Sequence, residues 1–141
     1  MSYKLLMDKN EVSGFVAEVF PQSKMYGMEV DHLEPGKIKV AMAVSDMHLR
    51  PGGTVSGPSM FTLADCATYL LILSHIGKVA LAVTTNLNIN FVSKPEGDLI
   101  AEAGFLKLGK RLAVCEVSIF SVKEKKLVAH ATATYSIPPN R

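Results

Sequence analysis

The sequence predicts an α+β fold in which one long apolar helix is covered by a curved antiparallel sheet of about six strands. The hydrophobic pattern has the helical period near the N-terminus and then changes to the alternating period of strands. Residues 58–76 are apolar around nearly the whole circumference of a helix, which is typical of a helix buried on nearly all sides. From residue 81 onward, alternating segments separated by short turns indicate consecutive strands in an antiparallel meander.

The first helix is expected over residues 8–20. Asp8 can cap its start and Pro21 ends it. Its apolar residues recur at the spacing of a single helical stripe, namely Val12, Phe15, Val16, Val19 and Phe20. The second helix begins at Pro58, which is favourable at the first helical position, and Gly77 is expected to end it.

Alternation of apolar and polar residues defines the strands. A weaker strand is expected over residues 25–33, joined to a stronger one over 38–44 by the turn at 34–37. In the strand at 81–91, Thr84 is expected to share a polar face with Asn86, Asn88 and Asn90. The remaining strands are expected over 99–105, 112–119 and 127–135.

Length and composition indicate one soluble, self-associating domain. The 141 residues are expected to form a single domain over 1–141, with residues 1–21 as an N-terminal helix packed on it. The chain is 48% hydrophobic and only 20% charged, which favours an additional buried surface such as a subunit interface. A net charge of +2 argues against a nucleic-acid partner.

Compartment and metal content are further expectations. Cys66 and Cys115 lack the spacing of a zinc or redox motif, and the histidines form no ligand set, so no metal is expected. The apolar stretch Met60–Ile76 carries Asp65 and His75 and is shorter than the ~20 residues of a membrane span. Because no leader pattern opens the chain, we expect a cytoplasmic protein without a membrane partner.

Four segments together resemble a known family, from about Gly36 to Pro138. They are GGTVSGPSMFTLADCA, VTTNLNINF, GDLIAEAGFLKLGKRLAVCEV and KKLVAHATATY. In this order and spacing they resemble the hotdog-fold acyl-CoA thioesterases of the PaaI-like (phenylacetate-pathway) branch. The resemblance implies a homodimer or dimer of dimers that hydrolyses acyl-coenzyme A without metal or cofactor. Ser56 and Arg50 stand where the family usually has histidine and asparagine.

Asp65 is the main catalytic candidate. It is the only carboxylate between Asp46 and Glu96, and it lies within a helix among apolar neighbours. A buried carboxylate requires either a partner, such as Tyr69 one turn on, or a chemical purpose. The resemblance favours the second alternative, with Asp65 as general base on water or as nucleophile on the thioester.

Gly57 is the expected electrophilic partner, since a backbone N–H at a helix N-terminus suits a developing oxyanion. Asp65 lies seven residues beyond Pro58, which is ~10 Å along a helix axis. One carbonyl group cannot contact both groups, so they must come from different subunits if both act. The active site should therefore straddle a dimer interface, as the resemblance also implies.

The remaining site candidates are less specific. Thr84, Arg50 and Ser56 are expected to hold the water or the carboxylate near the reacting group. The substrate pocket is expected to be lined by His48, Pro58, Tyr69 and Asn86. Cationic donors for the phosphates of coenzyme A are expected at Lys94, Lys107, Lys110 and Arg111.

Two other functions remain open on the sequence. A hotdog hydratase or dehydratase usually places a histidine beside the helix carboxylate, where this chain has Ser56. A non-catalytic acyl-CoA-binding protein is compatible with the departures at Arg50 and Ser56.

Overall fold

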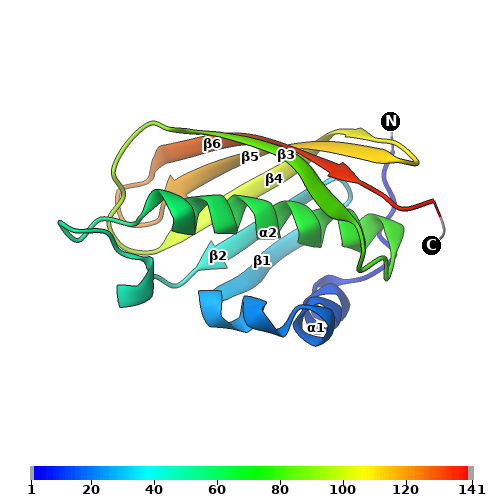
Figure 1. Ribbon diagram of the computed structural model, residues 1–141, viewed down its shortest axis with the longest axis horizontal. Coiled ribbons are helices and arrows are strands. Elements are labelled where there is room, and N and C mark those ends of the chain that lie inside the picture. The colour runs from blue at the N-terminus through cyan, green and yellow to red at the C-terminus, as the bar shows by residue number, and fades with distance from the viewer. Residues whose placement is uncertain (1, 140–141) are drawn as a thin grey trace.

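A computed structural model describes residues 2–139 of the chain, which form one six-stranded antiparallel sheet curved around a central helix (Figure 1). The strand order is β1-β2-β4-β5-β6-β3. The helices are α1 (Lys9–Val19) and α2 (Gly57–Ile76), with 3₁₀ turns η1 (Pro21–Tyr26) and η2 (Asp46–His48). The strands are β1 (Met28–Glu34), β2 (Lys37–Met42), β3 (Val83–Phe91), β4 (Leu99–Leu108), β5 (Leu112–Ser121) and β6 (Lys126–Ser136).

Helix α2 begins and ends where its sequence specifies. The Ser56 side chain accepts a hydrogen bond from the Ser59 amide, which satisfies one of the unpaired donors of the first turn. Gly77 ends the helix with a φ of 95°, a left-handed conformation that favours glycine. Between these ends, most of the large apolar side chains are buried against the concave face of the sheet, and Leu63, Leu71, Ile72 and Leu73 are fully buried.

By length and composition alone, α2 could cross a membrane, which differs from the expectation that this stretch is too short. Its most apolar window is 61% buried inside the protein, as the core helix of a sheet would be. Burial against the sheet therefore accounts for the apolar character of this helix.

The pairing of β3 differs from the expected meander. β3 pairs with β6 at one end of the sheet, whereas its successor β4 pairs with β2 and β5 in the middle. The reason is that α2 carries the chain across the sheet before β3 begins, so β3 joins the far edge. The chain must then return to the centre through residues 92–98.

Two local expectations were also wrong. Met25 and Tyr26 belong to the 3₁₀ turn η1, and the first strand begins only at Met28. Thr84 does not share a face with Asn86, because the β3–β6 register shifts between these two residues. This β-bulge inserts one extra residue, so Thr84 points to the α2 side with Tyr135, while Asn86 pairs with Thr134 on the other face.

Helix α1 covers one flank of the core and leaves the other open. Asp8 and Glu11 form a reciprocal capping box, and Val12 and Val16 are buried. α1 lies beside β1 and α2, so this edge of the sheet has a neighbour (Figure 1). Within residues 2–139 no further strand pairs with the outer edge of β3, and that edge is free to pair with another strand.

Candidate active site

The carboxylate of Asp65 receives two hydrogen bonds on one oxygen. The Thr84 hydroxyl donates to Oδ1 at 2.7 Å, and the Tyr135 hydroxyl donates to the same Oδ1 at 2.8 Å. Helix α2 supplies the carboxylate, while β3 and β6 supply the donors, which face one another across a paired register. Both donors are committed to Oδ1, so Oδ2 is the oxygen left for another group.

This carboxylate lies in a cleft of about 310 Å³ between α2, the end of α1 and the start of β3. Asp65 is half-buried, so water or a ligand can reach it. Tyr69 and Tyr135 stack with their ring centroids 6.1 Å apart, and the Tyr69 hydroxyl donates to the carbonyl of Ala80 at 2.8 Å. The cleft therefore has rigid aromatic walls and one carboxylate.

The three other titratable groups that line the cleft, Cys66, Tyr69 and Tyr135, are neutral near pH 7, and burial raises the pKa of each. Burial, together with the neighbouring Asp65 charge, raises the pKa of the Cys66 thiol to about 12. Burial and Asp65 also raise the pKa of Tyr135 above its ordinary range. The Tyr135 hydroxyl thus keeps its proton and can only act as a donor toward Asp65, and Cys66 is not a thiolate nucleophile.

The N-terminus of α2 forms a second group of candidate residues. The Gly57 amide has no helical acceptor, because the residue four positions earlier lies outside the helix. A Cβ at Gly57 would lie 3.2 Å from the ring of Phe91, so glycine permits the close approach of the end of β3. Ser56 donates from its hydroxyl to the Ser59 hydroxyl at 2.9 Å, and this chain of bonds continues to the carbonyl of His48.

The structure separates the predicted residues into these two groups. Thr84 and Tyr69 lie with Asp65 in the cleft, whereas Ser56, Pro58 and His48 line a smaller hollow of about 190 Å³ at the start of α2. Gly57 and Asp65 are eight residues apart on the same helix, which is about 12 Å along its axis. One chain therefore does not bring the two groups to one carbonyl carbon.

His48 is held by structural contacts. It is 2% exposed, its Nδ1 accepts from the Ser45 amide, and its Nε2 lies 2.9 Å from the carbonyl of Tyr26. Because a carbonyl only accepts, Nε2 carries the proton and both ring nitrogens are satisfied. This environment favours a role in fixing the loop before α2 over a role in binding substrate.

The other predicted binding residues are dispersed. Arg50 is exposed in a turn closed by hydrogen bonds to Thr54 and Gly53, and Asn86 is exposed on the sheet face opposite α2. Lys107, Lys110 and Arg111 lie in or beside the β4–β5 turn, at the end of the sheet where β3 begins. Lys94 follows the other end of β3, far from them within one chain.

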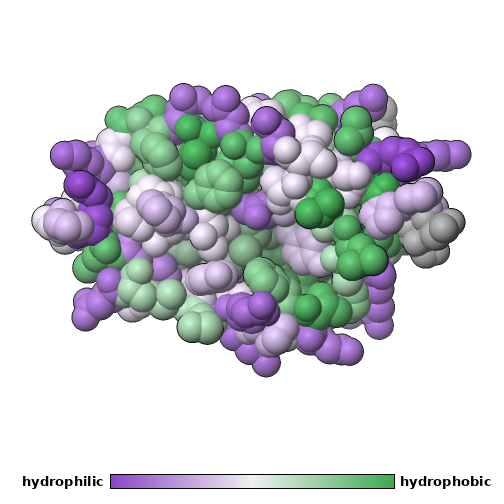
Figure 2. Space-filling view, viewed as in Figure 1, coloured by the Kyte–Doolittle hydropathy of each residue, from purple (hydrophilic) through white to green (hydrophobic). Residues whose placement is uncertain are grey.

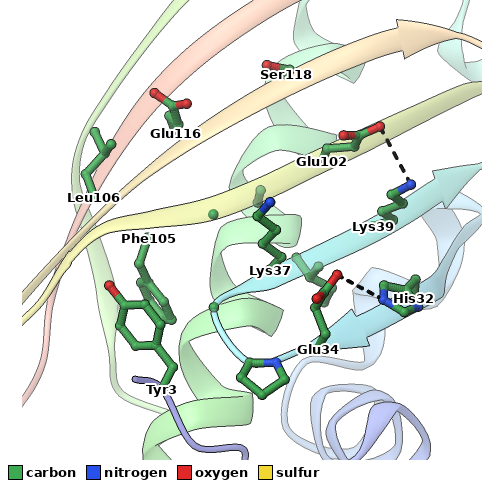
Figure 3. A pocket seen from close by; sticks show the side chains of 15 residues that line it. Tyr3, His32, Glu34, Lys37, Lys39, Glu102, Phe105, Leu106, Glu116 and Ser118 are labelled. Carbon is green, nitrogen blue, oxygen red and sulfur yellow. Dashed lines mark hydrogen bonds and ion pairs between the residues drawn. The ribbon is translucent and has the colours of Figure 1, made fainter. Parts of the chain in front are cut away.

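A larger hollow of about 400 Å³ lies by the β1–β2 turn, lined mainly by outward-facing residues of β2, β4 and β5 (Figure 3). Two of its carboxylates already have side-chain partners: Glu102 lies 4.0 Å from Lys39, and Glu34 lies 3.2 Å from Nε2 of His32. These side chains are about half exposed, whereas the Asp65 carboxylate accepts hydrogen bonds from half-buried Thr84 and buried Tyr135. The Asp65 cleft is therefore the better candidate for the active site.

Residues 2–139 contain no cluster of three or more His, Cys, Asp or Glu that could hold a metal ion.

Tyr135 is the residue that sequence reasoning missed. The alternation of the last strand assigns it only to the inward face. A tyrosine on an otherwise small, apolar face (Ala129, Ala131, Ala133) was the available signal, because a buried phenol requires a hydrogen-bond partner. A single sequence does not identify that partner.

Comparison with known proteins places the chain in a family. A family profile described as the thioesterase superfamily matches residues 52–128. Human acyl-coenzyme A thioesterase 13 is 31% identical over 101 residues, covering 71% of this chain and 72% of that protein.

Two solved structures are similar over most of the chain. A protein from a Silicibacter species, described as a putative thioesterase, is 49% identical, with a TM-score of 0.89 over 96% of this chain and 95% of that one. A mutant of the phenylacetic acid degradation protein PaaI from Thermus thermophilus is 31% identical, with a TM-score of 0.74 over 84% and 99%.

The fold and these relatives define the class: the chain belongs to the thioesterase superfamily and has the hotdog fold. Within it, the protein is a PaaI-like thioesterase, an enzyme that hydrolyses thioesters.

Proposed function

We propose that the protein hydrolyses acyl-coenzyme A to a free acid and coenzyme A at sites shared between two copies of the chain. Asp65 supplies the base or nucleophile, and the Gly57 amide of the other copy holds the oxyanion. The observation that carries this proposal is the Asp65 carboxylate fixed by Thr84 and Tyr135 in an accessible cleft. Acyl-CoA is the substrate class named for the human relative.

The chemistry requires a carboxylate whose second oxygen is free. Acting as base, Asp65 takes a proton from water, the water oxygen bonds to the thioester carbon, and the C–S bond breaks. The departing thiolate of coenzyme A then takes up that proton. In direct attack, Oδ2 instead bonds to the thioester carbon, the C–S bond breaks and coenzyme A leaves as a thiolate, which gives an anhydride. Water then cleaves the anhydride, which releases the acid and restores the Asp65 carboxylate, and a proton from that water passes to the thiolate. Both routes place negative charge on the carbonyl oxygen, where a backbone N–H at a helix N-terminus is stabilising.

The arrangement of β3 supports a shared site. Thr84, near the start of β3, touches Asp65, and Phe91, at its end, lies over Gly57. If two copies pair antiparallel along β3 about a two-fold axis near Leu87, Thr84 of one copy lies opposite Asn90 of the other. Asp65 of one copy then approaches Gly57 of the second, and two such sites form per dimer.

The same pairing would gather the cations and cover exposed apolar surface. Lys94 of one copy comes to the end of the sheet that carries Lys110 and Arg111 of the other, as phosphate binding by coenzyme A would require. Figure 2 shows an apolar area over the end of β3 and the first turns of α2. Its exposed residues include Phe61, Phe91 and Val92, at 40, 50 and 57% exposure. A further dimer of dimers is compatible with this arrangement.

Subunit complementation tests this proposal. Asp65→Asn removes the carboxylate, and Gly57→Val places a branched side chain where a Cβ already meets Phe91 at 3.2 Å. Each variant alone should lose acyl-CoA hydrolysis, measured by release of free thiol. Co-expressed, the two should form mixed dimers in which one site has both wild-type groups, and activity should return.

The control is a single chain carrying both substitutions, co-expressed with Asp65→Asn, which leaves no intact site in any pairing. If the mixed dimers stay inactive although both variants fold and dimerise, Asp65 and Gly57 do not act together across two chains. That result would refute the shared site. A wild-type protein that releases no thiol from any acyl-CoA would refute the substrate class.

A further inference from the structure

The cleft at Asp65 adjoins a second hollow. A groove of about 340 Å³ runs between α1, η1 and α2 over the start of β1. The cleft and the groove have three lining residues in common, Phe20, Cys66 and Tyr69. These shared residues lie between the two hollows, so a ligand bound at Asp65 lies next to the groove.

The deeper part of the groove is apolar. Val16, Val30 and Leu70 line it and are buried, with half-buried Met28 beside them. Lys9, Lys24 and Glu29 also line it but are exposed, so their charges lie at the rim in water. Among residues 2–139, no buried side-chain nitrogen or oxygen lacks a hydrogen-bond partner. Nothing deep in the groove therefore requires a polar or charged group on a ligand.

The route from Asp65 follows one side of α2. Asp65 and Cys66 are followed one turn later by Tyr69 and Leu70, so these four side chains form adjacent positions on the helix surface. Asp65 and Cys66 line the cleft, and Cys66 and Leu70 line the groove. A chain that leaves a carbonyl carbon at Asp65 along this side of α2 passes Phe20 and enters the groove.

We propose that the groove between α1 and α2 binds the distal part of an unbranched aliphatic acyl chain, with Phe20 and Tyr69 narrowing its entrance. This inference rests on the proposed function, because it assigns the acyl group of that reaction. Burial of successive methylene groups in the groove makes α1 and η1 the part of the protein that determines preference for long acyl chains.

The test fills the groove from α1. Ala17 is a half-buried lining residue, and Ala17→Phe places a ring in the groove without removing any polar contact. Hydrolysis of butyryl-, octanoyl- and palmitoyl-CoA is compared through kcat/KM. The ratio of palmitoyl to butyryl hydrolysis should fall at least tenfold, since the ring excludes several methylene groups. Glu18→Phe is the matched control: it adds the same ring to the same helix at an exposed position outside the groove, and the ratio should not change.

A second variant and a second readout separate the possible failures. Ser13→Phe fills the groove one turn earlier and should lower the same ratio. Binding of palmitate, a reaction product, is measured by calorimetry and should weaken in both filled variants. An unchanged ratio with unchanged palmitate binding, or an equal loss for all chain lengths, would overturn the groove as an acyl site. If wild type hydrolyses no acyl-CoA but binds palmitate in a way that Ala17→Phe abolishes, the proposed hydrolysis fails and the groove stands.

Discussion

The Tyr135 hydroxyl is expected to position the Asp65 carboxylate. Tyr135 is 3% exposed and donates to Oδ1 at 2.8 Å, beside the Thr84 donor at 2.7 Å. Tyr135→Phe removes one donor and leaves the ring against Tyr69. The carboxylate then keeps a single donor and can rotate away from the geometry in which Oδ2 faces the cleft.

The magnitude follows from the kind of hydrogen bond that is lost. A hydrogen bond to a charged group contributes about 1.5–3 kcal/mol. If it acts fully in the transition state, kcat should fall roughly 10- to 150-fold at 1.36 kcal/mol per factor of ten. KM should change little, because the hydroxyl bonds to Asp65 and the ring that lines the cleft remains. Adding Thr84→Val should cost more than the product of the single effects, since the last donor on Oδ1 is then lost.

The assay is thiol release from one acyl-CoA for wild type, Tyr135→Phe, Thr84→Val and the double variant. Tyr69→Phe is the matched control, because it removes a hydroxyl from the same cleft that donates to the carbonyl of Ala80 and not to Asp65. A Tyr135→Phe enzyme with kcat within twofold of wild type, or a loss of equal size in Tyr69→Phe, would refute the positioning role.

Two further predictions concern stability. Gly36 donates its amide to Nε2 of buried His75 at 2.9 Å, and burial lowers the pKa of this histidine, so folding favours the neutral ring. The neutral His75 ring therefore contributes fully to the free energy of unfolding above its unfolded pKa of about 6.5. This contribution is lost as the pH falls toward the lower pKa that His75 has in the folded protein. Urea unfolding between about pH 7.5 and pH 5 should show wild type losing more stability than His75→Leu. Equal pH slopes would contradict this, and His130→Leu, at a half-buried histidine of the sheet, serves as control. Ile72→Ala leaves a cavity between α2 and the sheet, where Ile72 is 0% exposed, and should cost about 2–5 kcal/mol of unfolding free energy. The control is Leu81→Ala, at a side chain that is 80% exposed, which should cost less than about 0.5 kcal/mol of unfolding free energy in thermal or urea unfolding. Similar costs for Ile72→Ala and Leu81→Ala would contradict the helix–sheet packing.

Local signals in the sequence account for much of the fold. Pro58 at the start, Gly77 at the end and the apolar circumference between them predict α2 to within one residue of its observed bounds. The alternation along 99–105 and 112–119 predicts the inward faces of β4 and β5, which pack on that helix. These features depend on residues near one another in the chain, so a single sequence contains them. It also identified Asp65 as a carboxylate in an apolar helix that required a partner.

The partners of Asp65 depended on the tertiary structure. Thr84 reaches the carboxylate because the bulge before Asn86 turns it toward α2, and Tyr135 reaches it from a strand 70 residues away. The position of β3 beside β6 was likewise not readable from strand order. The sequence by itself determined most of the residues that form the helices and strands, and which carboxylate is embedded among apolar side chains. Tertiary structure decided how the strands pair and which hydroxyls meet that carboxylate, because register and strand order minimise the free energy of packing between segments that have no local signal for one another.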